Sequence, residues 1–275
     1  YLFFASFLVS NLVHGEIISE EQIISAMKSV TSTKESLSKL ADAYPMFYGT
    51  KKQILIKHFK KTYQDGNYFS YIAEQFSQAG LNDTSSPIYK NNNNDIRMVA
   101  QNFSASIAES LLLKGLSRLS YENQKYFISH MALLMNIAEP RQCAAYLYPE
   151  RFEKNGAMKD ALIEMELLAK LPDTYIERYF FFARKAMSAE IKDSPIRREP
   201  SKSQQEFATN AFDVKIGELY GNHPNLNAML NFIDNPNSID YKAGCDSGLV
   251  VIDAMLSLEG NIQDWYLQNY MLQLH

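Results

Sequence analysis

The sequence predicts an all-α fold, an irregular bundle of about ten helices that could be arranged as two packed lobes. Three observations lead to this class. Apolar residues recur at helical spacing along most of the chain, capping patterns precede several of these stretches, and alternating strand patterns are almost absent. Glycine is scarce, at 11 residues, whereas tyrosine and phenylalanine number 17 and 16. Such a composition favours thick helical packing over a β fold rich in turns.

Capping patterns place the first two expected helices. In Ser19-Glu20-Glu21-Gln22, and again in Ser32-Thr33-Lys34-Glu35, a hydroxyl and a side chain three residues later can satisfy each other's backbone amides. A break is expected at Asp65-Gly66, and the polar stretch from Leu81 to Asp95 is the clearest loop. The helices expected before the main linker cover 20–30, 33–43, 51–79 with its break, 96–118, a segment from Ser120 to Ala138, a short segment from Pro140, 157–170 and 173–192.

The domain organisation follows from one strong break. Residues 193–203, DSPIRREPSKS, combine two prolines with several basic residues, which is typical of a linker. We therefore expect a main helical lobe over 16–192 and a C-terminal helical segment over 204–275, packed on that lobe. The helices expected in the last part of the chain lie near 203–220, 224–234, 238–257 and 261–274.

An uncharged apolar run opens the sequence and is predicted to be a truncated signal peptide, residues 1–15. Val13 and Gly15 occupy the −3 and −1 positions of a cleavage site after Gly15, and the polar, well-capped helix that follows suits a mature N-terminus. Export to the periplasm or secretion is then expected. About 13 apolar residues fall short of the roughly 18 to 20 that span a bilayer, so no integral membrane segment is predicted in the mature chain. The alternative is an apolar first helix that packs on the domain of a cytosolic protein.

Export changes how the two cysteines are interpreted. Two cysteines in an oxidising compartment usually pair, and both Cys143 and Cys245 lie on apolar helical stripes that point inward. A disulfide between them would close a loop of about 100 residues, for which chain entropy gives about 4 to 5 kcal/mol. The alternatives are buried free thiols and a catalytic cysteine, for which His130 is the nearest candidate base along the chain.

Acidic residues gather in the C-terminal quarter. The net charge is −4, but residues 1–202 carry 25 basic and 22 acidic side chains, whereas residues 203–275 carry 2 and 9. A balance this small gives no reason to expect nucleic-acid binding, while the local excess could steer a basic protein partner. The alternative is a set of ordinary solvated carboxylates. The candidate partner surface consists of Asp234, Asp240, Asp246 and Asp253.

No catalytic or metal-binding pattern stands out. The histidines do not share a metal-ligand spacing and neither cysteine belongs to a Cys-x-x-Cys pair, so no metal and no cofactor are predicted. Glu109, Glu164 and Glu166 could serve as acid or base in a hydrolase. Glu164 and Glu166 point about 200° apart on a helix, so they cannot form a shared pair alone.

One basic cluster could in principle follow the phosphates of a ligand. Its members fall at the spacing of a solvated helix face, and we favour that interpretation. The cluster consists of Lys51, Lys52, Lys57, Lys60 and Lys61, with Tyr63 and Tyr68.

The sequence therefore predicts an exported helical protein with a non-enzymatic binding role, as an inhibitor, immunity or accessory factor of the bacterial envelope. Its partner would be another protein in that envelope. A hydrolase of envelope material that uses a carboxylate acid or base is the first alternative. A cytosolic helical structural protein is the second.

Overall fold

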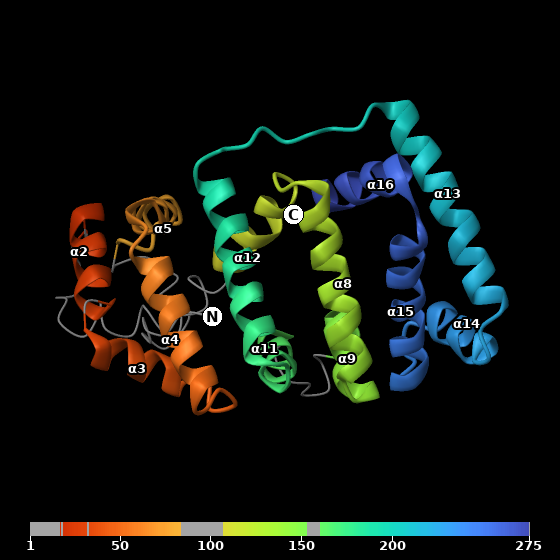
Figure 1. Cartoon of the computed structure of the whole chain (residues 1–275), viewed down its shortest axis with the longest axis horizontal. Coiled ribbons are helices and arrows are strands. Elements are labelled where there is room, and N and C mark those ends of the chain that lie inside the picture. Colours follow the sequence, from red (N-terminus) through yellow and green to blue (C-terminus); the bar gives the residue numbers. More distant parts are fainter. Residues whose placement is uncertain (1–16, 18, 32, 84–106, 153–159, 275) are drawn as a thin grey trace. The chain divides into compact units, whose positions relative to one another are not determined.

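The fold was obtained as a computed structural model that describes residues 17, 19–31, 33–83, 107–152 and 160–274. The predicted all-α class is confirmed: the described part of the chain contains thirteen helices, no strand and one isolated bridge between Ile17 and Asp83 (Figure 1). Within these ranges no helix combines the length and the apolarity that crossing a membrane requires. The predicted signal segment, residues 1–15, lies outside the described residues.

The chain forms two compact units. The first consists of Tyr1–Gly115 and Pro172–Ile196, and the second of Leu116–Leu171 and Arg197–His275. Residues 194–201 contain no helix, as the prolines predict. The contacts thus group 172–196 with the N-terminal helices and 116–171 with the C-terminal ones. The division into a 16–192 lobe and a 204–275 segment stays a prediction.

The first unit contains five helices with described bounds and a further helical stretch that is described from residue 107 onward. In it α2 packs on α5, and α4 packs on both α3 and α12. The apolar positions of α4 and α5 form much of its core, with Leu55, Phe59 and Phe69 at 7% exposure or less. The helices are α2 (Glu20–Thr31), α3 (Lys34–Asp42), α4 (Thr50–Tyr63), α5 (Gly66–Gln78) and α12 (Asp173–Ile191).

The predicted caps of this unit are observed, with one shift. The amide of Gln22 donates to Ser19 Oγ, and Gln22 Oε1 accepts from the amide of Ser19, which completes the first capping box. At α3 the cap is Thr33, whose Oγ1 accepts from the amide of Ser36 at 3.1 Å. Asp65 caps α5, so the break between α4 and α5 lies where the sequence predicts it.

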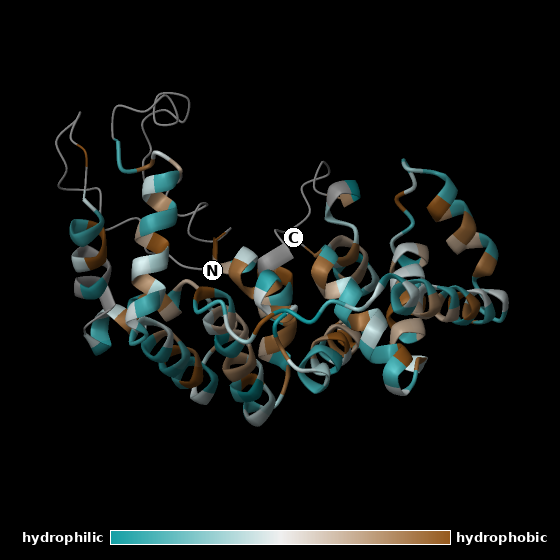
Figure 2. Ribbon diagram, turned by 90° about the horizontal axis from the view of Figure 1, so that it is seen from above, coloured by the Kyte–Doolittle hydropathy of each residue, from teal (hydrophilic) through white to brown (hydrophobic). Residues whose placement is uncertain are grey.

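The second unit is built around α15 (Tyr241–Ser257), which packs against five other helices of that unit. Hydrophobic and hydrophilic residues share each helix in Figure 2, as amphipathic packing requires. Gly244 and Gly248 allow α15 to approach its neighbours closely, since an added Cβ would lie 2.9 Å from the Phe232 ring and 2.3 Å from Leu147 Cδ1. The other helices are α8 (Tyr121–Ile137), α9 (Pro140–Leu147), α10 (Pro149–Phe152), α11 (Asp160–Lys170), α13 (Lys202–Gly221), α14 (Leu226–Asp234) and α16 (Gly260–Gln273).

Candidate functional site

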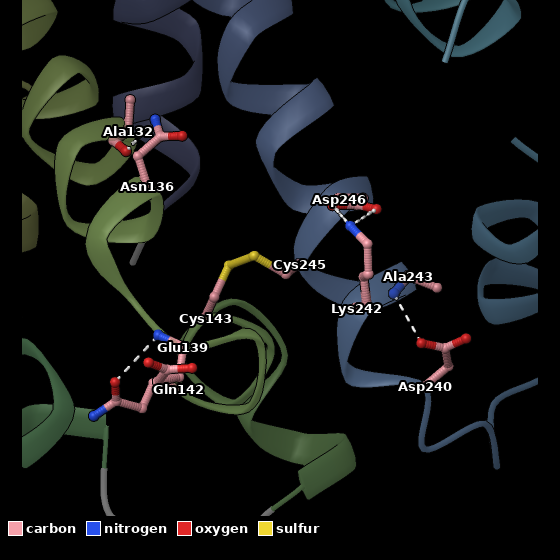
Figure 3. Close-up of a disulfide and its surroundings, with 10 residues drawn as sticks. All are labelled: Ala132, Asn136, Glu139, Gln142, Cys143, Asp240, Lys242, Ala243, Cys245 and Asp246. Carbon is pink, nitrogen blue, oxygen red and sulfur yellow. Dashed lines mark hydrogen bonds and ion pairs between the residues drawn. A yellow bond between two sulfur atoms is a disulfide. The ribbon is translucent and has the colours of Figure 1, made fainter. Parts of the chain in front are cut away.

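The two cysteines meet in the second unit. Cys143 lies on α9 and Cys245 on α15, with Cα atoms 5.3 Å apart and the sulfur atoms at disulfide distance (Figure 3). Both side chains are buried, Cys143 completely. A thiol enclosed in this way could not reach a substrate, so the geometry favours the structural pairing over the catalytic alternative.

The four aspartates of the predicted partner surface have different roles. Asp240 caps α15 by accepting from the amide of Ala243 at 3.0 Å, and Asp246 accepts from Lys242 at 3.0 Å (Figure 3). Asp246 also accepts from Asn225 at 2.7 Å. Asp234 and Asp253 are exposed, and neither has a partner among the described residues. Two of the four carboxylates therefore stabilise α15 and its neighbour, and two remain available to an incoming cation.

Exposed apolar residues accompany the acidic residues of α14. Leu230 and Ile233, one turn apart, are 44% and 45% exposed, and Ile239 in the following loop is 63% exposed. Met229 and Phe232 of the same helix are buried, and Ile233 lies at the edge of the face that they form. We define the α14 surface as Leu230, Ile233 and Asp234 of α14 with Ile239 and Asp240 of the following loop; Asp234 is its carboxylate without a partner among the described residues, whereas Asp240 also caps α15.

The glutamates proposed for a hydrolase do not converge on one another. Glu166 accepts a hydrogen bond from Gln142 at 3.2 Å, whereas Glu164 lies 3.9 Å from Nε2 of the buried His130. Glu109 is exposed. In the described part of the chain, no three His, Cys, Asp or Glu side chains form a group that could hold a metal ion.

A pocket that the sequence did not reveal lies among α2, α3, α4 and α5. Its volume is about 590 Å³, and the described residues of its lining include four lysines and no carboxylate. Lys57 and Lys60 come from the basic cluster of α4, while Lys28 and Lys34 come from α2 and α3. We call this the lysine pocket. Its other lining residues are Thr33, Leu37, Gln53, Ile56, Tyr63, Gln64 and Phe69.

A second feature of α4 is a histidine that is held neutral. The ring of His58 stacks on Phe180, with centroids 4.3 Å apart and planes 12° apart, and its Nδ1 lies 2.8 Å from Arg184 Nη1. Because guanidinium can only donate, Nδ1 must be the acceptor of a neutral ring. Desolvation, and then the charge of Arg184, lower the pKa of His58 to about 3.

Lys57, Lys60 and Lys61 are exposed, as the solvated-face interpretation of the basic cluster expects, whereas His58 of the same helix packs its ring against α12. Positions 53, 56, 57, 60 and 64 line the lysine pocket, and positions 54, 57, 58 and 61 line a smaller one beside α12. The i, i+3, i+4, i+7 spacing of each set is visible in the sequence. The partners that each stripe meets on other helices are not.

Comparison of the chain with protein-family models, with curated proteins and with solved structures finds no match in any of the three. We therefore infer the function from the contacts, burial and charges of the described residues.

Proposed function

We propose that the chain is an exported, non-enzymatic binding protein of the bacterial envelope, acting as an inhibitor, immunity or accessory factor, and that its α14 surface binds a basic protein. One observation carries the proposal. Leu230 and Ile233 are 44% and 45% exposed on the same helix as Asp234, a carboxylate without a partner among the described residues, and Ile239 in the following loop is 63% exposed. Buried apolar area supplies affinity in protein interfaces, whereas charge complementarity selects the partner and speeds association.

The charge of the surrounding sequence supports a basic partner. Residues 203–275 carry 9 acidic and 2 basic side chains, and one of the two lysines, Lys242, already pairs with Asp246. A basic partner would therefore meet a favourable field beyond the α14 surface itself. Export is supported by the buried cysteine pair, since such pairs persist in oxidising compartments.

The test uses two variants of the α14 surface. Ile233→Ser removes apolar area and Asp234→Lys reverses a charge that has no structural partner among the described residues. Capture from an envelope fraction, followed by a binding assay with the purified partner, should show an affinity loss of about tenfold or more for each variant, as expected of residues central to an interface. The partner itself should carry basic residues at the contact.

Glu122→Lys is the matched control for the charge reversal. Glu122 is an exposed carboxylate of the same unit, on α8, and has no partner among the described residues. Its reversal should leave the affinity within about twofold, because a distant exposed charge is screened by salt. Equal losses from Asp234→Lys and Glu122→Lys would contradict the assignment of the α14 surface.

The hydrolase alternative is separated by a different measurement. Among their described lining residues, the lysine pocket has no carboxylate and the smaller pocket beside α12 has one, Glu177. The buried His130 near Glu164 is the arrangement that most resembles acid and base groups. Release of products from purified envelope material, abolished by Glu164→Gln, would establish that function in place of binding.

A further inference from the structure

We propose that the lysine pocket binds a small amphiphilic anion, a compound with a compact anionic head and an apolar body. The site lies in the first unit and is independent of the α14 surface in the second. Its volume, about 590 Å³, falls within the roughly 300 to 1,000 Å³ of typical small-molecule sites.

The cations of the site come from three helices. Lys28 on α2, Lys34 on α3, and Lys57 and Lys60 on α4 line one cavity, and no acidic residue is found among its described lining. Lys57 pairs with Glu177 at 2.9 Å, and that glutamate lines the neighbouring pocket. Lys34 and Lys60 have no ion-pair partner among the described residues. A bound anion would supply these two ammonium groups with a counter-charge.

The distribution of polarity within the pocket determines the shape of the ligand. The lysines and both lining glutamines, Gln53 and Gln64, are exposed, so polar groups surround the mouth. Its apolar lining consists of side chains that are at most 9% exposed, namely Leu37, Ile56, Tyr63 and Phe69. A ligand would place its charge at the mouth and its apolar part against this floor, as selective sites combine apolar walls with few polar groups.

Two details favour an aliphatic body and a simple head over a nucleotide. The rings of Tyr63 and Phe69 stack on each other, 5.7 Å apart and at 12°, and are nearly buried. They leave little ring surface on which a nucleotide base could stack. Because stacking is a main source of affinity for bases, the pocket is poorly suited to a nucleotide. Lysine ammonium groups act as point charges without the planar fork of arginine, which suits a phosphate, sulfate or carboxylate approached from several directions.

The test is calorimetric titration of the full chain with octyl phosphate below its micelle concentration. Inorganic phosphate supplies the head alone and 1-octanol the body alone. Octyl phosphate should bind at least about tenfold more tightly than either, because burial of even two methylene groups is worth about that much. Equal affinity for inorganic phosphate and octyl phosphate would overturn the apolar part of the proposal.

Two double variants test the location. Lys34→Gln with Lys60→Gln should weaken octyl phosphate binding about tenfold, since each exposed charge contact contributes modestly. The control is Lys61→Gln with Lys185→Gln, which changes the net charge equally at exposed positions of the same unit outside the pocket. Equal weakening by the two pairs would show that binding follows net charge and would refute the pocket.

Two further arms complete the test. Gln53→Trp fills the mouth from an exposed position and should abolish binding while the circular dichroism spectrum stays helical.

Vesicles with an anionic lipid and vesicles of zwitterionic lipid separate a lipid headgroup from a free amphiphile. Attachment to anionic vesicles without any binding of octyl phosphate would assign the lysines to a membrane surface and overturn the pocket.

Discussion

At the scale of single residues, His58 shows how far an environment can depart from its sequence context. It lies between Lys57 and a further lysine pair, Lys60-Lys61, which suggests a solvated face. The helix instead turns its ring onto Phe180 and beneath a donor from Arg184. A protonated ring would have to give up that hydrogen bond and face a guanidinium at contact distance, so the neutral form is preferred.

This preference predicts how stability depends on pH. The folded-state pKa of His58 is about 3, below the value of about 6.5 in an unfolded chain. Its stabilising contribution is thus complete above about pH 6.5 and is lost as the pH falls toward 3, by at most about 1.4 kcal/mol per pH unit. Urea unfolding of the wild type and of His58→Gln should show a difference in unfolding free energy that shrinks on acidification. A pH-independent difference would contradict the neutral histidine.

At the scale of helices, glycine contacts determine where two elements can approach. A Cβ at Gly115 would lie 2.0 Å from the carbonyl oxygen of Ala186, a backbone atom of α12 that cannot swing away. Gly217, in the middle of α13, has nothing within 4 Å of the same position. The two glycines therefore have opposite meanings: the first permits a helix crossing, whereas the second only weakens its own helix.

The same substitution should consequently have opposite signs at the two sites. Gly115→Ala is expected to lower the free energy of unfolding by at least about 1 to 3 kcal/mol, the cost of overpacking. Gly217→Ala should raise it by about 0.5 to 1 kcal/mol through helix propensity. Chemical denaturation of both variants checks the pair, with the Gly217→Ala protein as the control for the change itself. Stabilisation by both would show that Gly115 is not a contact residue.

The helices themselves could be predicted because their signals are local. Capping boxes, proline and apolar spacing are contained within a few residues, and they place the starts of α2, α4 and α12 within a residue or two. Buried glutamines carry no such signal. Gln268 Nε2 donates to the carbonyl of Ser117, 151 residues away along the chain, and Gln268 Oε1 accepts from Gln124 Nε2 at 2.9 Å. This pair satisfies a helix terminus that only the tertiary structure brings within reach.

At the scale of the whole molecule, one candidate site can be recognised from the amino-acid sequence, whereas the other depends on residues that only the tertiary structure brings together. The acidic excess of residues 203–275 is a property of composition, so the amino-acid sequence alone reveals it. The sequence reveals only part of the lysine pocket. Lys57 and Lys60 lie on one face of α4, whereas Lys28 and Lys34 belong to α2 and α3. The structural use of Asp240 and Asp246 is hidden for the same reason, since a cap or an ion pair needs its partner in place.

The cysteine pair tests the prediction of export, because a disulfide forms in an oxidising compartment and stabilises the folded chain. Cys143 and Cys245 are 102 residues apart in sequence and join α9 to α15 at disulfide distance. If the exported chain carries this bond, titration under denaturing conditions without reductant should detect no thiol. Reduction should then lower the free energy of unfolding by about 4 to 5 kcal/mol, the chain-entropy value for a loop of about 100 residues.

The control for that measurement is the same chain produced in a reducing cytosol, which should titrate two thiols and unfold at the lower urea concentration. Reductant should not change the free energy of unfolding of this cytosolic chain. A decrease that reductant causes only in the exported chain is therefore due to the disulfide. If two thiols are detected in the chain taken from the envelope, the disulfide is absent. The prediction of export then has no support from the cysteine pair. The lysine pocket would be unaffected, because its lining residues and the two cysteines belong to different units.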